Sequence, residues 1–196
     1  MRRFTGFSFN IFWHRNRSSA LPERQHQPQK IMSTLRETFI ETLQDTYDAE
    51  HQIINALHKV TDNVENDELI EAVESHLEET EEHVKRLEQV FEQLGEKASR
   101  KKCAGMAGLI AEGQEVMEKN QGDAAIILAL QKVEHYEIAA YGALISWANL
   151  LGEEKASTVL QKTLDEEKKA DQKLNGIAEE SVNLEEGGDS EQRKAA

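Results

Sequence analysis

Proline, cysteine and aromatic residues are scarce in this chain of 196 residues. Two prolines and an aromatic content of 6%, beside abundant Leu, Ala, Glu, Gln and Lys, favour helix and argue against a sheet. The single cysteine, Cys103, excludes a disulfide within the chain and suits a reducing compartment. We therefore expect a cytoplasmic, helical protein.

Long apolar runs are also absent, and positive charge is in the minority. No segment approaches the roughly 20 apolar residues that span a bilayer. The chain has 23 Lys and Arg residues against 37 Asp and Glu residues, which gives a net charge of −14. Because such an acidic surface repels phosphate groups, neither nucleic acid nor an anionic membrane is an expected partner.

The first 31 residues differ from the rest, since six basic residues and one acidic residue give them a net charge of +5. They lack a clean apolar core and a small-residue cleavage site, so they match a signal peptide poorly. We interpret residues 1–32 as a disordered basic extension, or as upstream sequence read in frame ahead of a start at Met32. The alternative is a tail that docks through its aromatic residues.

Apolar residues recur with helical spacing through the remainder of the chain. The pattern predicts four long helices and one shorter one, at about 33–60, 67–94, 104–119, 123–151 and 153–179. The connection from Gly95 to Gly122 is much longer than the other connections between long helices. We predict an all-α, ferritin-like four-helix bundle over residues 33–183, with a long crossover that carries the short helix, and a disordered tail over residues 184–196.

Two acidic residues interrupt the apolar face of the third long helix. At about 100° per residue, Glu134 and Glu137 share an arc with Ile127, Leu130 and Tyr141. Carboxylates on an apolar helix face are costly unless a positive charge meets them. A metal ion is the simplest such partner, and it predicts further ligands on the facing helices.

The other long helices also turn polar residues toward the bundle interior. The inward residues are Glu50, His76, His83, Glu167 and Asp171, with Glu79 at the edge of its stripe, whereas Asp45 and Asp48 point outward. Carboxylates with one or two imidazoles suit iron or manganese, and bridging carboxylates hold two ions a few Å apart. We predict two metal ions, iron or manganese, bound by Glu50, Glu79, Glu134, Glu137, Glu167, His83 and Asp171.

Each of these residues also has an ordinary structural interpretation. A single Glu among them is more often solvated, and inward acids can be protonated or paired with lysines and arginines. His76 is then a hydrogen-bonded core histidine, or an outer partner that orients a metal ligand. Tyr141 is a packing residue or another such outer partner. The joint pattern over four helices favours the metal site.

Five segments resemble, in this order, the YciE/YciF family of ferritin-like proteins: Leu43–Glu50, His76–Thr80, Lys102–Ile110, Val133–Gly142 and Thr163–Lys168. The resemblance covers about residues 33–183. It implies a bundle related to rubrerythrin, with a two-metal site, a homodimer and a loose association with bacterial stress responses. In rubrerythrin-like sites the third long helix supplies a Glu-x-x-Glu pair, which matches Glu134 and Glu137.

The sequence departs from the rubrerythrin pattern where Glu-x-x-His motifs are expected. Three residues after Glu79 stands Glu82, and three residues after Glu167 stands Ala170. No Cys-x-x-Cys pair is present, so the rubredoxin-like electron-transfer module is missing. Three functions stay open: reaction of a dinuclear metal centre with peroxide or oxygen, metal binding without turnover, and a structural bundle without metal.

Overall fold

The computed structural model describes residues 28–184, which form helices and no strand within that range. The α-helices are α1 (Pro28–Val60), α2 (Asp67–Gln93), α3 (Ala104–Glu118), α4 (Asp123–Leu151) and α5 (Glu154–Ile177). A 3-10 turn (Thr61–Asn63) follows α1, and a π-helical turn (Ala178–Val182) follows α5. The predicted all-α, ferritin-like bundle with a helical crossover is confirmed. None of these helices is apolar over a length that could cross a membrane.

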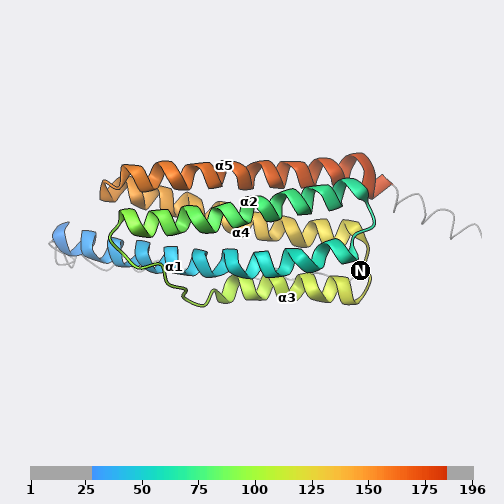
Figure 1. Ribbon diagram of the computed structural model, residues 1–196, viewed down its shortest axis with the longest axis horizontal. Coiled ribbons are helices and arrows are strands. Elements are labelled where there is room, and N and C mark those ends of the chain that lie inside the picture. The colour runs from blue at the N-terminus through green and yellow to red at the C-terminus, as the bar shows by residue number, and fades with distance from the viewer. Residues whose placement is uncertain (1–27, 185–196) are drawn as a thin grey trace, which may run out of the picture.

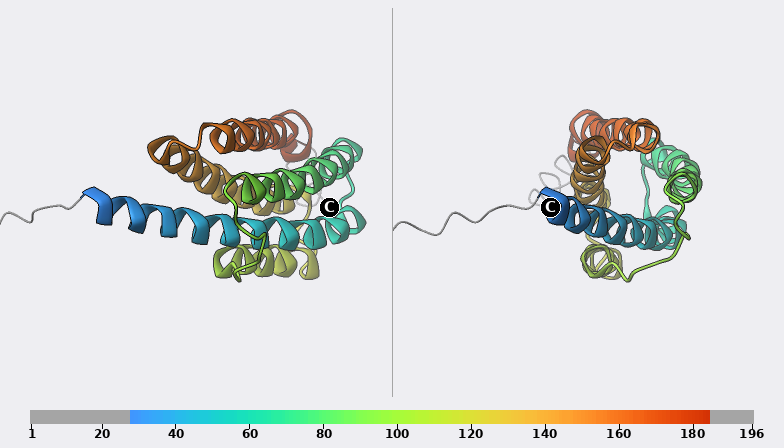
Figure 2. Two further views of the ribbon diagram at one scale, coloured as in Figure 1. Left: turned by 60° about the vertical axis from the view of Figure 1, so that its left-hand side comes forward. Right: turned by 90° about the vertical axis from the view of Figure 1, so that its left-hand side faces the viewer.

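The four long helices form a ring in which each packs against two neighbours. α1 and α5 both lie beside α2 and α4, so α2 and α4 are diagonally opposite (Figure 2). Tight turns make α1 antiparallel to α2, and α4 antiparallel to α5 (Figure 1). α4 runs parallel to α2, so the chain must first return to the end of the bundle where α2 began. α3 covers this distance along the outside of α1 and α4.

Two local signals place helix ends as the sequence predicts. The Asn66 side chain accepts the backbone N–H of Leu69 at 3.0 Å, which caps the start of α2. Gly152 ends α4 in the left-handed conformation, with φ at 77°, which glycine adopts without a steric penalty.

The first helix begins at Pro28 rather than near Ser33. Proline suits the first turn of a helix, because its φ is already helical and its missing N–H would have no intrahelical partner there. Residues 28–32, which we assigned to the N-terminal extension, are therefore helical. The rest of that predicted extension lies outside the described residues, as does the predicted tail of residues 184–196 apart from Leu184, which is still helical.

The core consists of two apolar clusters with a polar layer between them. One cluster contains Ile53, Leu69 and Ile127, and the other contains Phe39 and Leu87. Each long helix contributes to both clusters, and at or next to the change from one cluster to the other it carries at least one buried, inward acid or histidine. The fold therefore collects the inward polar residues at one level of the bundle.

Asp48 is buried, although the helical wheel turned it outward. Its carboxylate accepts the backbone N–H of Cys103 at 2.9 Å and the Nε–H of Arg100 at 2.8 Å. Burial alone would raise the pKa of Asp48, but these hydrogen bonds lower it below its usual value. Helical periodicity distinguishes only the side that faces the bundle interior from the opposite side. Asp48 lies on the opposite side of α1, and the crossover covers that side. The same segment buries Cys103, whose Sγ lies 3.0 Å from the Tyr136 hydroxyl.

Candidate metal centre

The polar layer contains two groups of metal-ligating side chains. The first group is His76, Glu134, Glu137 and Glu167, and the second is Glu50, His83 and Glu167. Within each group, one nitrogen or oxygen from every residue lies within 4.8 Å of the others. None of these six side chains belongs to a residue more than 7% exposed. Glu167 belongs to both groups, so it would serve both if each held an ion.

Helical spacing explains how so few turns of chain supply these ligands. Glu134 and Glu137 are three residues apart on α4, so they share a face on successive turns. His76 and His83 are seven residues apart on α2, which is close to two full turns. Glu50 on α1 and Glu167 on α5 complete the layer from the other two helices. All four long helices therefore contribute.

The side chains of this layer leave many polar atoms without hydrogen bonds. Among the described residues, nine buried side-chain nitrogen and oxygen atoms lack a partner, and all except Thr46 Oγ1 belong to these six residues. An unsatisfied buried polar atom costs about 1–3 kcal/mol, so eight at one place need a common explanation. Cations would satisfy the carboxylate oxygens and one nitrogen of each imidazole through their lone pairs, and the carboxylate–imidazole set fits iron or manganese.

The contacts between the histidines and the acids within the two groups also lack hydrogen-bond geometry. His83 Nδ1 lies 3.0 Å from Glu167 and 3.7 Å from Glu50, and His76 Nε2 lies 3.2 Å from Glu134. Neither ring nitrogen forms a hydrogen bond in these contacts. Such contacts fit a charged imidazole beside a carboxylate when no metal is bound, and they also place these atoms where ligands of one shared ion would lie.

Outer partners fix two of the candidate ligands. Glu166 lies 2.9 Å from His83 Nε2 and is itself held by Arg86, which contacts both of its oxygens. Although burial raises the pKa of Glu166, Arg86 and His83 lower it below the usual value. A charged Glu166 favours the proton on Nε2 and leaves the Nδ1 lone pair facing Glu50 and Glu167. The Tyr141 hydroxyl donates a hydrogen bond to Glu50.

Protons can neutralise the layer when no metal is bound. Burial raises the pKa of Glu134 to about 8 and that of Glu137 well above its usual value, and neighbouring carboxylates add to both effects. Burial lowers the pKa of His76 and His83, but nearby carboxylates outweigh it and raise these values to about 9 and about 11. Metal binding near neutral pH must therefore displace protons.

Two predicted ligands lie outside both groups. Glu79 has a side chain that is 44% exposed, and its carboxylate lies 3.8 Å from His76 Nδ1. Asp171 lies 3.5 Å from the exposed His135 and from Gln131, one turn beyond the polar layer. Glu79 lies about one helical turn from His76, and Asp171 lies about one turn from Glu167. Helical periodicity places both residues of each pair on the same face, so it predicted Glu79 and Asp171 as ligands too.

Two other residues have roles that the sequence did not indicate. His76, predicted as an outer partner, lies within the first group. Glu166 was not singled out, because its position beside His83 depends on how α5 packs against α2. No signal within either helix could have revealed that contact.

A cavity of about 200 Å³, lined by six polar and six apolar residues, leads to the layer between α2 and α5. Its inner wall includes His76 and Glu134, and Lys169, Lys173, Glu79 and Ser75 contribute polar groups to its lining. Both lysines are exposed, so they lie at the outer end of the cavity. Water and ions can reach the candidate centre by this side.

Similarity to known proteins agrees with the fold and the segments quoted above. A family model described as a domain of unknown function (DUF892) matches residues 34–186. Protein YciF of Escherichia coli strain K12 is 46% identical over 157 residues, which cover 78% of this chain and 95% of YciF.

Two solved structures are similar over most of their length. The crystal structure of the E. coli stress protein YciF has a TM-score of 0.73 at 45% identity, and the match covers 76% of this chain and 97% of that one. YcfI of Rhodopseudomonas palustris, described as a candidate structural protein, has a TM-score of 0.72 at 42% identity. The match covers 74% of this chain and 94% of YcfI. This chain therefore belongs to the YciE/YciF family, whose members contain the DUF892 domain.

Proposed function

We propose that this protein binds two metal ions, iron or manganese, in the polar layer of the bundle. The ligands are Glu50, His76, His83, Glu134, Glu137 and Glu167. One observation carries the proposal: eight buried polar atoms of these residues have no hydrogen-bond partner and converge in two groups that share Glu167. The bound ions would supply one-electron chemistry toward dioxygen or peroxide.

The residues around the layer suit a protective role in the bacterial stress response. Four carboxylates stabilise a high metal charge, and the apolar clusters above and below the layer leave the α2–α5 cavity as the route for water. Burial and the Glu50 carboxylate raise the pKa of Tyr141 well above its usual value, so this residue keeps its proton and directs it at Glu50. The similarity to YciF, described as a stress protein, supports this assignment.

Metal analysis of protein purified without added metal tests the binding site. We expect close to two ions per chain, and we expect Glu137→Ala to lose metal while its circular dichroism keeps the helical signal. Glu81→Ala, which changes an exposed acid on α2, is the matched control. A wild-type protein without metal that melts at the same temperature with and without added iron would refute the proposal.

Turnover requires a separate measurement, because metal binding alone does not establish it. Consumption of hydrogen peroxide or dioxygen by the iron-loaded protein would identify a small oxidase or peroxidase. Iron-loaded protein that consumes neither would be a metal-binding bundle without catalytic activity, which is the alternative function. The cavity beside Lys169 and Lys173 supports access of a polar oxidant such as peroxide.

We also propose that the protein forms a homodimer. Leu128 and Leu150 on α4 are 56% and 65% exposed, and they lie within about 40° of each other around the helix. They lie about 33 Å apart along α4, so a second subunit that covers both would pack lengthwise against this helix. Sedimentation equilibrium should give twice the mass of the chain, and Leu128→Glu combined with Leu150→Glu should give a monomer.

A further inference from the structure

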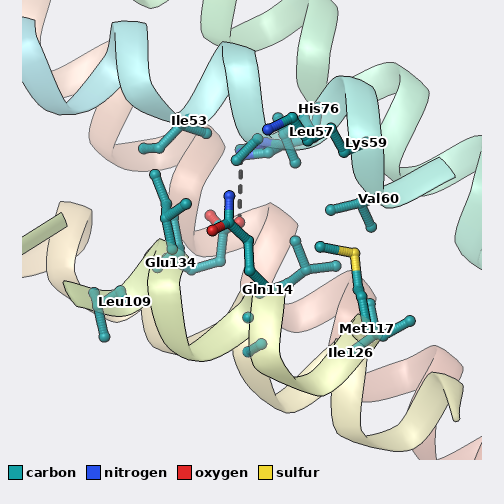
Figure 3. A pocket seen from close by; sticks show the side chains of 16 residues that line it. Ile53, Leu57, Lys59, Val60, His76, Leu109, Gln114, Met117, Ile126 and Glu134 are labelled. Carbon is teal, nitrogen blue, oxygen red and sulfur yellow. Dashed lines mark ion pairs between the residues drawn. The ribbon is translucent and has the colours of Figure 1, made fainter. Parts of the chain in front are cut away.

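A second cavity reaches the candidate metal centre from the side opposite Lys169 and Lys173. It has a volume of about 50 Å³ and lies between α1, α3 and α4, with His76 and Glu134 at its inner end (Figure 3). The other lining residues are Ile53, Ala56, Leu57, Lys59, Val60, Leu109, Ile110, Gly113, Gln114, Met117, Ile126, Ala129, Leu130 and Val133. Of the sixteen lining residues, twelve are apolar.

The crossover helix creates this cavity by covering the groove between α1 and α4. Leu109, Ile110 and Met117 line the cavity from α3, and α3 packs against α4 where a Cβ at Gly113 would be in ordinary contact, at 3.6 Å, with the Ala129 Cβ. Lys59 is exposed and marks the outer end, while Gln114 points from α3 into the cavity (Figure 3). The space is therefore a narrow apolar passage with polar groups only at its two ends and at Gln114.

The lining selects against polar guests. A buried water needs about two to four polar partners, and between the two ends the lining supplies only Gln114. Hydrogen peroxide has the same difficulty, because it carries two hydroxyl groups that would lose their hydrogen bonds at about 1–3 kcal/mol each. A small molecule without hydrogen-bonding groups loses nothing on entry, and small apolar cavities bind such molecules, including xenon.

We propose that this α1–α3–α4 cavity admits dioxygen, a small nonpolar oxidant, to the His76–Glu134 edge of the metal centre. This inference rests on the proposed function and narrows it, because it names the oxidant that uses each side. Dioxygen enters between α1, α3 and α4, whereas ions, protons and peroxide use the lysine-rimmed cavity between α2 and α5.

Xenon binding tests the cavity without reference to metal. Xenon is an apolar atom of similar size to dioxygen, and its NMR signal or its position in pressurised crystals reports where it binds. We expect one xenon site in the metal-free wild-type protein at this cavity. Ala129→Phe and Ile110→Trp, which enlarge lining side chains on α4 and α3, should each abolish or reduce it. Ala111→Trp, on the exposed side of α3, is the matched control and should bind xenon as the wild type does.

Oxidation of iron-loaded protein tests the selectivity of the passage. Each dioxygen takes one electron from each of two ferrous ions and two protons from water, and leaves as hydrogen peroxide. In the peroxide reaction, each hydrogen peroxide takes one electron from each of two ferrous ions and two protons from water, and leaves as two waters. We expect Ala129→Phe and Ile110→Trp to slow oxidation by dioxygen roughly tenfold or more while the rate with peroxide stays at the wild-type value. Circular dichroism melting identifies any variant that does not fold, and the other variant then decides.

The outcomes separate this inference from the metal site itself. A wild-type protein that binds iron but no xenon overturns the dioxygen passage and leaves the metal centre intact. Filled variants that slow both oxidants equally also overturn it, because the cavity would then not distinguish them. A wild-type protein that binds xenon but no iron refutes the proposed function, and the use of the cavity for oxidation falls with it.

Discussion

The Nε2 atom of His83 lies 2.9 Å from a carboxylate oxygen of Glu166, and the other ring nitrogen faces Glu167 at 3.0 Å. Adjacent residues of α5 thus contact opposite sides of one imidazole. Glu166 is held by Arg86 and is one-quarter exposed, whereas Glu167 is fully buried. The arrangement orients the ring so that one nitrogen serves a hydrogen bond and the other is available to a metal ion.

Loss of Glu166 should weaken metal binding without removing a ligand. We expect Glu166→Ala to lower metal affinity by about 10- to 100-fold, because His83 loses the partner that fixes its orientation and tautomer. Competition with a coloured chelator measures this change. Asp165→Ala removes the neighbouring exposed acid and should bind metal as tightly as the wild type does. Equal affinities for the two variants would argue against a role for Glu166.

The shared carboxylate predicts a difference between two single substitutions. Glu167→Ala should abolish binding of both ions, since this residue belongs to both groups. Glu50→Ala should remove a ligand of one group only, so about one ion per chain should remain. Metal content by mass spectrometry, with circular dichroism to verify folding, distinguishes them. Retention of one ion by Glu167→Ala would show that the two groups do not share it.

The two predicted ligands outside the groups can be tested in the same way. Asp171→Asn should leave the metal content unchanged, because Asp171 contacts Gln131 and His135 instead of the layer. Glu79→Gln should also retain two ions, with at most a modest loss of affinity through His76. If either variant loses an ion, that residue is a ligand, as its helical spacing predicts.

Stability of the metal-free protein should fall as the pH rises. The folded state raises the pKa of Glu134 from 4.5 to about 8 and that of His76 from 6.5 to about 9. Protons held more tightly by the folded state stabilise it fully below the unfolded pKa, and this stabilisation is lost as the pH rises through the folded pKa. The two residues act in the same direction between about pH 5 and pH 9.

Urea unfolding of chelator-treated protein near pH 6 and near pH 9 measures this effect. We expect a lower midpoint at the higher pH. The affinity for metal ions should instead increase with pH, because the ions must replace these protons in order to bind. A metal-free protein that becomes more stable toward pH 9 would contradict the assignment of raised pKa values to the layer.

Asp48 should control how firmly the crossover is attached. We expect Asp48→Ala to lower the free energy of unfolding by about 1–3 kcal/mol, because the Cys103 N–H and the Arg100 guanidinium lose their acceptor. Cys103, which is fully buried, should then react faster with a thiol reagent. Asp62→Ala, at an exposed turn, is the control. An unchanged thiol reaction rate would show that other contacts hold this segment.

Local patterns were sufficient to predict much of the architecture. Helical periodicity placed five helices close to their observed bounds, because the spacing of apolar residues along each segment shows which side of the helix is buried. The start of α1 was missed because the Thr34–Glu37 capping pattern is strong locally, yet Pro28 can begin the helix earlier. The inward positions of Glu50, His83, Glu134, Glu137 and Glu167 followed from the same periodicity.

Contacts between helices could not be obtained in this way, because they depend on packing between segments far apart in the chain. A helical wheel gives a direction but neither a depth nor a neighbour, so it grouped Glu79 and Asp171 with the buried acids and turned Asp48 toward solvent. Because α5 packs between α2 and α4, Glu167 lies near both His76 and His83. The same packing brings Glu166 into contact with His83. The amino-acid order alone therefore specifies the helices and their polar faces, whereas the two convergent groups, their outer partners and the two cavities exist only once the helices are packed.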